Sequence, residues 1–270
     1  MPDFLAVCEQ AARAGGAVLL DWAERFSVRE KGPSDLVTEA DVASQEVVRG
    51  ILLAAFPDHD FLSEEDPDSP ATAAGRARDS AHSAGQLTDR YRWIVDPLDG
   101  TTNYVHRIPE FAVSIGLERA GEVLVGCVFN PVSGECYTAS RGGGAFLNGR
   151  LLAVSQATEL SHALVAASFP PKVDPGSRVL RDFAEAIVAC QSIRRTGSAA
   201  LNLCYVAAGR FDAYWARETK IWDVAAGSLL IREAGGLITG LDGAPFRLDR
   251  PQFIAAATEP LHRQLRAIVG

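Results

Sequence analysis

The chain has 270 residues, of which 47% are hydrophobic and 22% are charged, a composition typical of a soluble protein with a well-buried core. Its net charge of -8 argues against a surface that binds nucleic acid, because such surfaces are normally basic. The first residues show no basic segment followed by a long apolar stretch, and no apolar run approaches the roughly 20 residues of a membrane helix. We therefore expect a cytoplasmic protein that binds neither nucleic acid nor a membrane.

Two amphipathic helices are predicted near the start of the chain. Apolar residues recur at helical spacing over residues 3–24. A second helix should begin near Thr38, because Thr38-Glu39-Ala40-Asp41 has the pattern of a capping box, and Pro57 follows its end. Residues 66–90 come next, rich in Ala, Ser, Asp, Gly and Pro, and this composition predicts a mobile surface insertion rather than a linker between domains.

Strands are predicted in the middle of the chain. Residues 92–95, 111–118 and 123–129 have strand patterns, and the last two are separated by a turn at residues 119–122. Residues 141–144, Arg-Gly-Gly-Gly, form a further tight connection. They are not the phosphate-binding loop of nucleotide hydrolases, because the chain contains no G-x-x-x-x-G-K-[ST].

The second half of the chain alternates strands and helices. Its predicted strands are residues 163–167, 192–194, 211–215 and 253–256. Its predicted helices are residues 178–190, 199–208, 223–234 and a C-terminal segment, with Ser198 capping the second of these and Gly209 ending it. This order predicts mixed α and β layers that share one core, as two packed halves of approximately residues 1–150 and 151–270 in a single domain.

The cysteines are predicted to be structural. The five of them are odd in number and widely spaced, and no two form a C-x-x-C pair. We therefore expect small core side chains in a reducing compartment rather than disulfides or a zinc site. They are Cys8, Cys127, Cys136, Cys190 and Cys204.

The most informative stretch follows the strand that begins near Arg92. This strand delivers Asp96 to its end, and Asp99 comes three residues later, just before the polar turn Gly100-Thr101-Thr102-Asn103. Pro97 and Gly100 constrain the turn so that both carboxylates can converge on one point. Two carboxylates and a carbonyl oxygen are hard ligands suited to magnesium, and the amides of the turn could hold a phosphate oxygen. An ordinary Asp-rich turn is the alternative for any single D-x-x-D.

Further acidic residues lie where a metal cluster would need them. Glu64 and Glu65 directly follow a strand-like apolar segment, and Asp223 stands near the start of a nearly apolar helix. Simple helix capping is an alternative role for Asp223, and Asp41 has the same two roles open to it. No Cys or His nucleophile is needed for such a site, and we expect His106 to be structural or exposed.

Taken together, these motifs resemble the inositol monophosphatase family. The elements are Ser63-Glu64-Glu65, Asp96-Pro97-Leu98-Asp99-Gly100-Thr101-Thr102-Asn103 and Trp222-Asp223-Val224-Ala225-Ala226-Gly227. Lys31, residues 35–41, 144–149 and 194–200 match in the same order. The resemblance runs essentially from end to end. It implies a five-layered α-β-α-β-α sandwich of the inositol monophosphatase and fructose-1,6-bisphosphatase type, usually a homodimer, that is inhibited by lithium.

The resemblance also implies two to three magnesium ions and a set of residue roles. Glu64, Asp96 and the carbonyl of Leu98 would bind the first ion, Asp96, Asp99 and Asp223 the second, and Glu64, with Asp41 through water, the third. Thr101, paired with Asp41, would orient the attacking water, and Glu64 would take part in catalysis through the metal. The residues implied in binding the small phosphorylated substrate are Asp99, Gly100, Thr101, Gly197, Ser198, Ala199 and Asp223.

The chain departs from the inositol-specific members at the connection before Trp222. Those members hold substrate hydroxyls with a Glu, whereas this chain has Ala216 there, followed by Arg217 and Glu218. The loss of one charge-assisted hydrogen bond, worth roughly 1.5–3 kcal/mol, would be enough to redirect substrate preference. Either of the next two residues could substitute in a re-routed loop, and a drifted loop residue of modest effect is the other interpretation. The insertion at residues 66–90 is also longer than usual in the family.

Three functions remain open on the sequence. The first is magnesium-dependent hydrolysis of inositol 1-phosphate or a similar polyol phosphate. The second keeps this chemistry with histidinol phosphate, fructose 1,6-bisphosphate or a 3'-phosphorylated adenine nucleotide, the last disfavoured because Thr102 stands where that branch usually has Lys. The third is a regulatory binding protein that keeps the fold.

Overall fold

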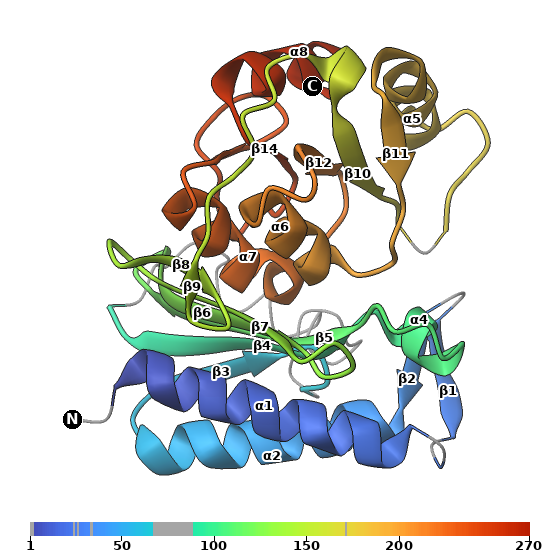
Figure 1. Cartoon of the computed structure of the whole chain (residues 1–270). Helices are drawn as coiled ribbons and strands as arrows, with labels where there is room; N and C mark the ends of the chain where they lie inside the picture. The colour runs from blue at the N-terminus through green and yellow to red at the C-terminus, as the bar shows by residue number, and fades with distance from the viewer. Residues whose placement is uncertain (1–2, 24, 26, 33–34, 67–88, 171) are drawn as a thin grey trace.

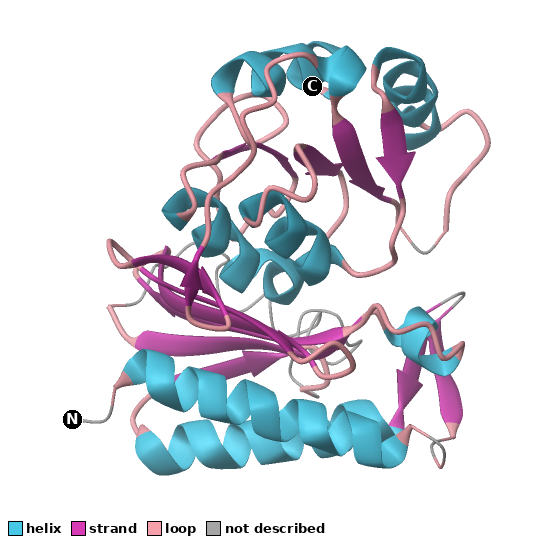
Figure 2. Ribbon diagram, viewed as in Figure 1, coloured by secondary structure: helices cyan, strands magenta, loops and turns pink. Residues whose placement is uncertain are grey.

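The computed structural model describes residues 3–23, 25, 27–32, 35–66, 89–170 and 172–270. The elements stack in five layers, in which two sheets alternate with three layers of helices (Figures 1 and 2). This is the α-β-α-β-α sandwich predicted from the sequence. None of the helices within the described residues is long and apolar enough to cross a membrane.

The outer helical layer on the N-terminal side consists of α1 (Phe4–Trp22) and α2 (Glu39–Ala55). The predicted capping box begins α2, with the Thr38 side chain accepting from the Ala40 amide and the Asp41 side chain from the Thr38 amide. Two glycines let α1 lie close to its neighbours. A Cβ on Gly15 would stand 2.8 Å from Val48 Cγ2 in α2, and one on Gly16 would stand 2.7 Å from Phe129 in the sheet.

A seven-stranded sheet lies against these two helices, in the order β3-β4-β5-β6-β7-β8-β9. Its strands are β3 (Asp60–Ser63), β4 (Tyr91–Asp99), β5 (Ala112–Arg119), β6 (Glu122–Asn130), β7 (Glu135–Ser140), β8 (Gly144–Leu147) and β9 (Arg150–Leu151). Strands β3 and β4 run parallel, whereas the other neighbours are antiparallel. The carboxyl ends of β3 and β4 therefore meet at one edge, which brings Glu64 beside Asp96.

The middle layer contains α6 (Ala199–Ala207) and α7 (Ile221–Glu233), which are buried between the two sheets. Small residues allow this close packing. A Cβ on Gly227 of α7 would lie 2.4 Å from Leu203 of α6, and a Cβ on Gly126 of β6 would lie 2.9 Å from the Cα of Ala226. Both helices are apolar around most of their circumference, as expected of helices with protein on every side.

The second sheet has the order β11-β10-β12-β14-β13, and α5 (Arg178–Ala189) and α8 (Glu259–Val269) cover its outer face. Its strands are β10 (Leu164–Ser168), β11 (Ser192–Arg194), β12 (Ala213–Ala216), β13 (Leu237–Thr239) and β14 (Phe253–Ala256). Strands β10 and β12 are parallel, so the residues after Ser168 and Ala216 leave the sheet at the same edge. A short 3-10 helix, η1 (Leu160–His162), precedes β10.

Most of the predicted elements are confirmed, with small shifts at their ends. The sequence analysis did not predict β7, β8, β9 and β13, the hairpin of β1 (Val28–Gly32) and β2 (Asp35–Thr38), or the short helix α4 (Thr101–Val105). Helix α7 begins at Ile221, two residues earlier than predicted. Most of the predicted insertion, residues 67–88, lies outside the described residues. All five cysteines are buried free thiols, as predicted.

Candidate active site

Asp96 and Asp99 are brought together by an irregularity at the end of β4. Residues three apart in a regular strand point to opposite faces, but the pairing of β4 with β5 shifts between these two residues. Asp96 Oδ1 accepts from the Leu98 amide at 3.0 Å, and the Pro97 carbonyl accepts from Ser44 of α2 at 3.0 Å. Asp96 is 2% exposed and Asp99 is 7% exposed. The turn therefore presents two buried carboxylates on one side.

The N-terminus of α6 holds the Asp99 carboxylate. The Ser198 hydroxyl donates to Asp99 Oδ2, and the amides of Ala199 and Ala200 donate to its two oxygens at 3.1 and 2.9 Å. Ser198 also caps the helix, because its Oγ accepts from the Leu201 amide at 3.2 Å. Burial raises the pKa of Asp99, whereas these hydrogen bonds to its carboxylate lower it.

Asp223 completes a cluster of three aspartates from β4 and α7. It is the third residue of α7, and its Oδ2 accepts from the Lys220 amide at 2.8 Å, so the predicted capping role is real. One carboxylate oxygen each from Asp96, Asp99 and Asp223 lie within 4.8 Å of one another. Capping and cluster formation are therefore compatible in this side chain.

The cluster is electrostatically incomplete without a cation. Burial raises the pKa of Asp96 well above its usual value, and the charges of Glu64, Asp99 and Asp223 raise it further. Burial and then the charge of Asp99 likewise raise the pKa of Asp223. Within the described part of the chain, no Lys or Arg forms an ion pair with any of these three aspartates. Convergent oxygen atoms with unbalanced negative charge fit a hard divalent cation.

Glu64 lies beside this cluster at the end of β3. Its amide donates to the Val95 carbonyl at 3.3 Å, which continues the pairing of β3 with β4. Its charge contributes to the raised pKa of Asp96, so the two carboxylates interact directly through space. Glu64 is half-buried.

Thr101 links the Asp-rich turn to α2. Its hydroxyl lies 3.1 Å from the Leu98 carbonyl oxygen and 3.4 Å from Asp41 Oδ1. The other oxygen of Asp41 accepts from the Thr38 amide at 2.8 Å and from the Thr38 hydroxyl at 2.6 Å. Asp41 therefore caps α2, which is one of the two roles that the sequence left open, and its other carboxylate oxygen faces Thr101.

Gly100 fits a conformation that other residues would adopt only with strain. Its φ is +96°, and a Cβ there would stand 2.8 Å from the Glu110 carbonyl oxygen. Gly197, with φ +94°, likewise packs against Asn103, whose amide group donates to the carbonyls of Glu110 and Thr196 at 2.7 and 2.8 Å. Asn103 thus joins the Asp-rich turn to the turn before α6. The sequence analysis gave Asn103 no role, although it ends the motif.

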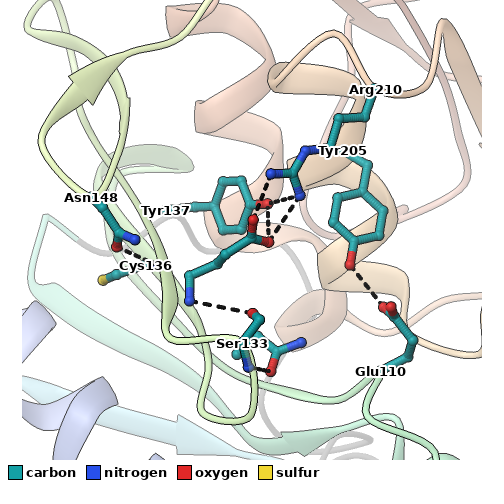
Figure 3. Close-up of polar contacts among 9 residues, drawn as sticks. Glu110, Ser133, Cys136, Tyr137, Asn148, Tyr205 and Arg210 are labelled. Carbon is teal, nitrogen blue, oxygen red and sulfur yellow. Dashed lines mark hydrogen bonds and ion pairs between the residues drawn. The ribbon is translucent and has the colours of Figure 1, made fainter.

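A polar network, also missed from the sequence, fastens α6 to the first sheet (Figure 3). Tyr205 donates to Glu110 Oε2 at 2.8 Å, and Arg210 donates to Glu135 Oε2 and to the Tyr137 hydroxyl at 2.9 and 3.0 Å. The hydrogen bond from Arg210 lowers the pKa of Glu135. Because the first residues of α6 also donate hydrogen bonds to Asp99, this network helps to hold the cluster in place.

The candidate specificity residues lie after β12. Ala216 is fully buried, and Glu218 is exposed. The Arg217 guanidinium donates to buried Asp182 and, at 2.7 Å, to the Val269 carbonyl. Arg217 is therefore engaged with α5 and the end of α8. His106 is exposed, as one of its two predicted placements had it.

The fold and the site define an α/β protein with a cluster of three carboxylates that could hold a metal ion. The profile of the inositol monophosphatase family matches residues 2–269. The inositol-1-monophosphatase of Rhizobium meliloti is 42% identical over 95% of this chain and 92% of its own. The Nus factor SuhB of Pseudomonas aeruginosa is 39% identical over 96% and 93%. The crystal structure of extragenic suppressor protein suhB from Bartonella henselae superposes with a TM-score of 0.86 at 36% identity, covering 98% of this chain and 97% of that one.

The chain belongs to the inositol monophosphatase family. It is a phosphoric monoester hydrolase, as the sequence analysis predicted.

Proposed function

We propose that this protein hydrolyses a small phosphate monoester, such as inositol 1-phosphate or a similar polyol phosphate, in a magnesium-dependent reaction in the cytoplasm. One observation carries the proposal: oxygens of Asp96, Asp99 and Asp223 lie within 4.8 Å of one another and have no basic partner among the described residues. Relatives named inositol-1-monophosphatase support the substrate class.

The cluster would hold two to three magnesium ions. The ligands would be Glu64, Asp96, Asp99, Asp223 and the carbonyl oxygen of Leu98, with Asp41 contributing through water. Bound divalent cations lower the pKa of a water and neutralise the charge of the phosphate, which is what monoester hydrolysis at neutral pH requires. Burial and the neighbouring carboxylates raise the pKa of Asp96 and of Asp223, so a cation would compete with protons for these side chains.

Thr101 and Asp41 would orient the attacking water. The Thr101 hydroxyl, 3.4 Å from Asp41 Oδ1, donates toward that carboxylate and leaves its lone pair free to accept from the water. Asp41 is itself held by two hydrogen bonds from Thr38, which fix its carboxylate on the side of Thr101. The water would give its proton to Thr101 Oγ1, and the Thr101 hydroxyl its proton to Asp41 Oδ1, as the new phosphorus–oxygen bond forms. The ester phosphorus–oxygen bond would break in the same step, and the leaving alkoxide would take a proton from a solvent water.

The substrate phosphate would lie on the turn between β4 and α4. The Gly100 and Thr101 amides would donate to its oxygens, and Gly197 would border the same space. The Ser198 hydroxyl and the Ala199 amide donate to Asp99 in the structure. These two residues would therefore serve substrate binding by fixing Asp99.

The decisive test is release of inorganic phosphate as magnesium is varied. We expect no turnover in chelator and saturable turnover with added magnesium, on at least one of inositol 1-phosphate, histidinol phosphate and fructose 1,6-bisphosphate. The Arg263→Gln variant is a control for protein handling, because Arg263 is exposed on α8 and pairs only weakly with Glu259. Turnover that is unchanged by removal of magnesium would contradict the proposal. A homodimer and inhibition by lithium are further parts of it.

A regulatory role is the second candidate, because relatives with the name Nus factor SuhB share up to 39% identity with this chain. We propose that such a role, if present, accompanies catalysis, since every candidate metal ligand is retained. A wild-type protein that releases phosphate from none of a broad panel of monoesters would favour the regulatory role alone.

A further inference from the structure

In the segment between β12 and α7, residues 217–220, two side chains contact the rest of the protein and two are exposed to solvent. Arg217 donates to the Val269 carbonyl at 2.7 Å and to Asp182, and the Thr219 hydroxyl donates to the Pro251 carbonyl. These contacts attach the segment to α5, to the end of α8 and to the loop before β14. The two residues that alternate with them, Glu218 and Lys220, are exposed. The segment is thus held rigidly while it presents one acid and one base to solvent.

Lys220 is placed next to the carboxylate cluster by the backbone. Its amide donates to Asp223 Oδ2 at 2.8 Å, and it directly precedes the first residue of α7. Among the residues that the structure describes, no carboxylate lies within 4.0 Å of the Lys220 ammonium.

The residue at the end of β12 offers no group that would bind a hydroxyl. Ala216, the last residue of β12, is fully buried and contributes only a methyl group. Arg217 is engaged with Asp182 and cannot reach the cluster without breaking that buried pair. Lys220 is therefore the charged residue of this segment that lies closest in sequence to the cluster. Its ammonium is a compact cation on a flexible side chain and is suited to binding an anionic oxygen.

We propose that Lys220 is a specificity-determining residue that binds a second anionic group of the substrate, a phosphate or a carboxylate on the alcohol moiety. This inference rests on the proposed phosphatase function and narrows its substrate class. The preferred substrate is then a phosphate monoester whose alcohol carries a second negative charge, and inositol 1-phosphate, whose alcohol is uncharged, is the poorer substrate. Glu218, exposed two residues before Lys220, opposes the same anionic group.

Matched ester pairs isolate this contact. 2-Phosphoglycerate and glycerol 2-phosphate differ by a carboxylate, and fructose 1,6-bisphosphate and fructose 1-phosphate differ by a second phosphate. For each pair, the preference is the kcat/KM of the doubly charged ester divided by that of its partner. We expect Lys220→Gln to lower this preference about five- to tenfold, mainly through KM, because a partly exposed charge pair contributes up to about 1 kcal/mol and a desolvated one more. The pair that responds more identifies the group as carboxylate or phosphate.

Three further variants test the direction of the effect. Glu218→Gln should raise the same preference, Lys220→Arg should retain most of it, and Arg263→Gln, a distant loss of one positive charge, should leave it unchanged. If Lys220→Gln lowered kcat/KM equally for both esters of each pair, Lys220 would act only through Asp223, and the inference would be overturned. The inference would also be overturned if Glu218→Gln lowered turnover of the esters of uncharged alcohols while Lys220→Gln had no effect. That result would favour binding of substrate hydroxyls by Glu218. A wild-type protein that hydrolyses inositol 1-phosphate but none of the four esters would overturn this inference and leave the proposed function standing, whereas inactivity on inositol 1-phosphate and histidinol phosphate as well would refute the proposed function.

Discussion

Replacing Asp96 with Asn should stabilise the metal-free protein while abolishing turnover. Asn is nearly isosteric and keeps the oxygen that accepts from the Leu98 amide at 3.0 Å. The change removes one negative charge from a buried cluster whose oxygens lie within 4.8 Å of one another. At that distance and an effective dielectric constant of about 20, two full charges repel by about 3.5 kcal/mol. Uptake of protons relieves part of this repulsion, so we expect a net gain of about 1–3 kcal/mol.

The pH dependence of this effect follows from the direction of the pKa shift. The pKa of Asp96 is raised in the folded protein by burial and by Glu64, Asp99 and Asp223, so the folded state holds the proton more tightly than the unfolded state. In the metal-free wild type, the contribution of the Asp96 carboxyl to the free energy of unfolding is therefore complete at a pH below the usual carboxyl pKa. This contribution is lost as the pH rises toward the pKa of Asp96 in the folded state. The advantage of Asp96→Asn should accordingly be larger at pH 8 than at pH 5.

Denaturant unfolding in chelator and in millimolar magnesium measures both effects. Magnesium should stabilise the wild type and have much less effect on Asp96→Asn, because a ligand that binds only the folded state adds stability in proportion to its affinity. Turnover of the variant should fall by at least about 100-fold, which corresponds to the several kcal/mol supplied by a bound metal. Asp182→Asn is the matched control, since it breaks a buried pair with Arg217 and should destabilise equally with and without magnesium. An Asp96→Asn variant that is less stable than the wild type in chelator and keeps wild-type turnover would refute the reasoning.

Three further predictions concern positions around and away from the cluster. Thr101→Ala should lower kcat by about 10²–10⁴-fold, and Thr101→Ser should recover part of it, in steady-state phosphate release. Ser198→Ala removes the cap of α6 and a hydrogen bond to Asp99, and should cost about 1–2 kcal/mol in unfolding and raise the magnesium concentration for half-maximal activity. Burial, followed by the charge of Arg266, lowers the pKa of His262. The stability it contributes is present above pH 6.5 and lost as the pH falls toward the folded-state pKa, so His262→Gln should flatten the unfolding profile between pH 7 and 5.

The aspartate cluster could be predicted because two of its three members lie in one short motif. Asp96 and Asp99 are three residues apart at the end of a strand, and the constrained turn Asp96-Pro97-Leu98-Asp99 keeps their carboxylates close together. The start of α7 was predicted two residues late because Asp223 was taken for the first residue of the helix, whereas it occupies the third position and bonds back to Lys220. The local sequence thus identified Asp223 as a site residue but did not give its correct position in α7.

The supporting contacts could not be predicted, because they depend on tertiary structure. Ser198 and the amides that hold Asp99 come from a helix about 100 residues further along the chain, and nothing in either segment alone specifies the other. Arg217 has the charge of a substrate-binding residue, yet Asp182 of α5 and the Val269 carbonyl take up its guanidinium. The short strands β8 and β9 carry few residues each, too few for a periodic pattern to stand out.

The most direct test of the account is where manganese, an anomalously scattering substitute for magnesium, binds in crystals soaked with manganese and inorganic phosphate. We expect anomalous peaks at about 2.1–2.2 Å from carboxylate oxygens of Asp96, Asp99 and Asp223, with phosphate beside the Gly100 and Thr101 amides. Peaks confined to exposed carboxylates, with these three aspartates bound to no cation, would contradict it.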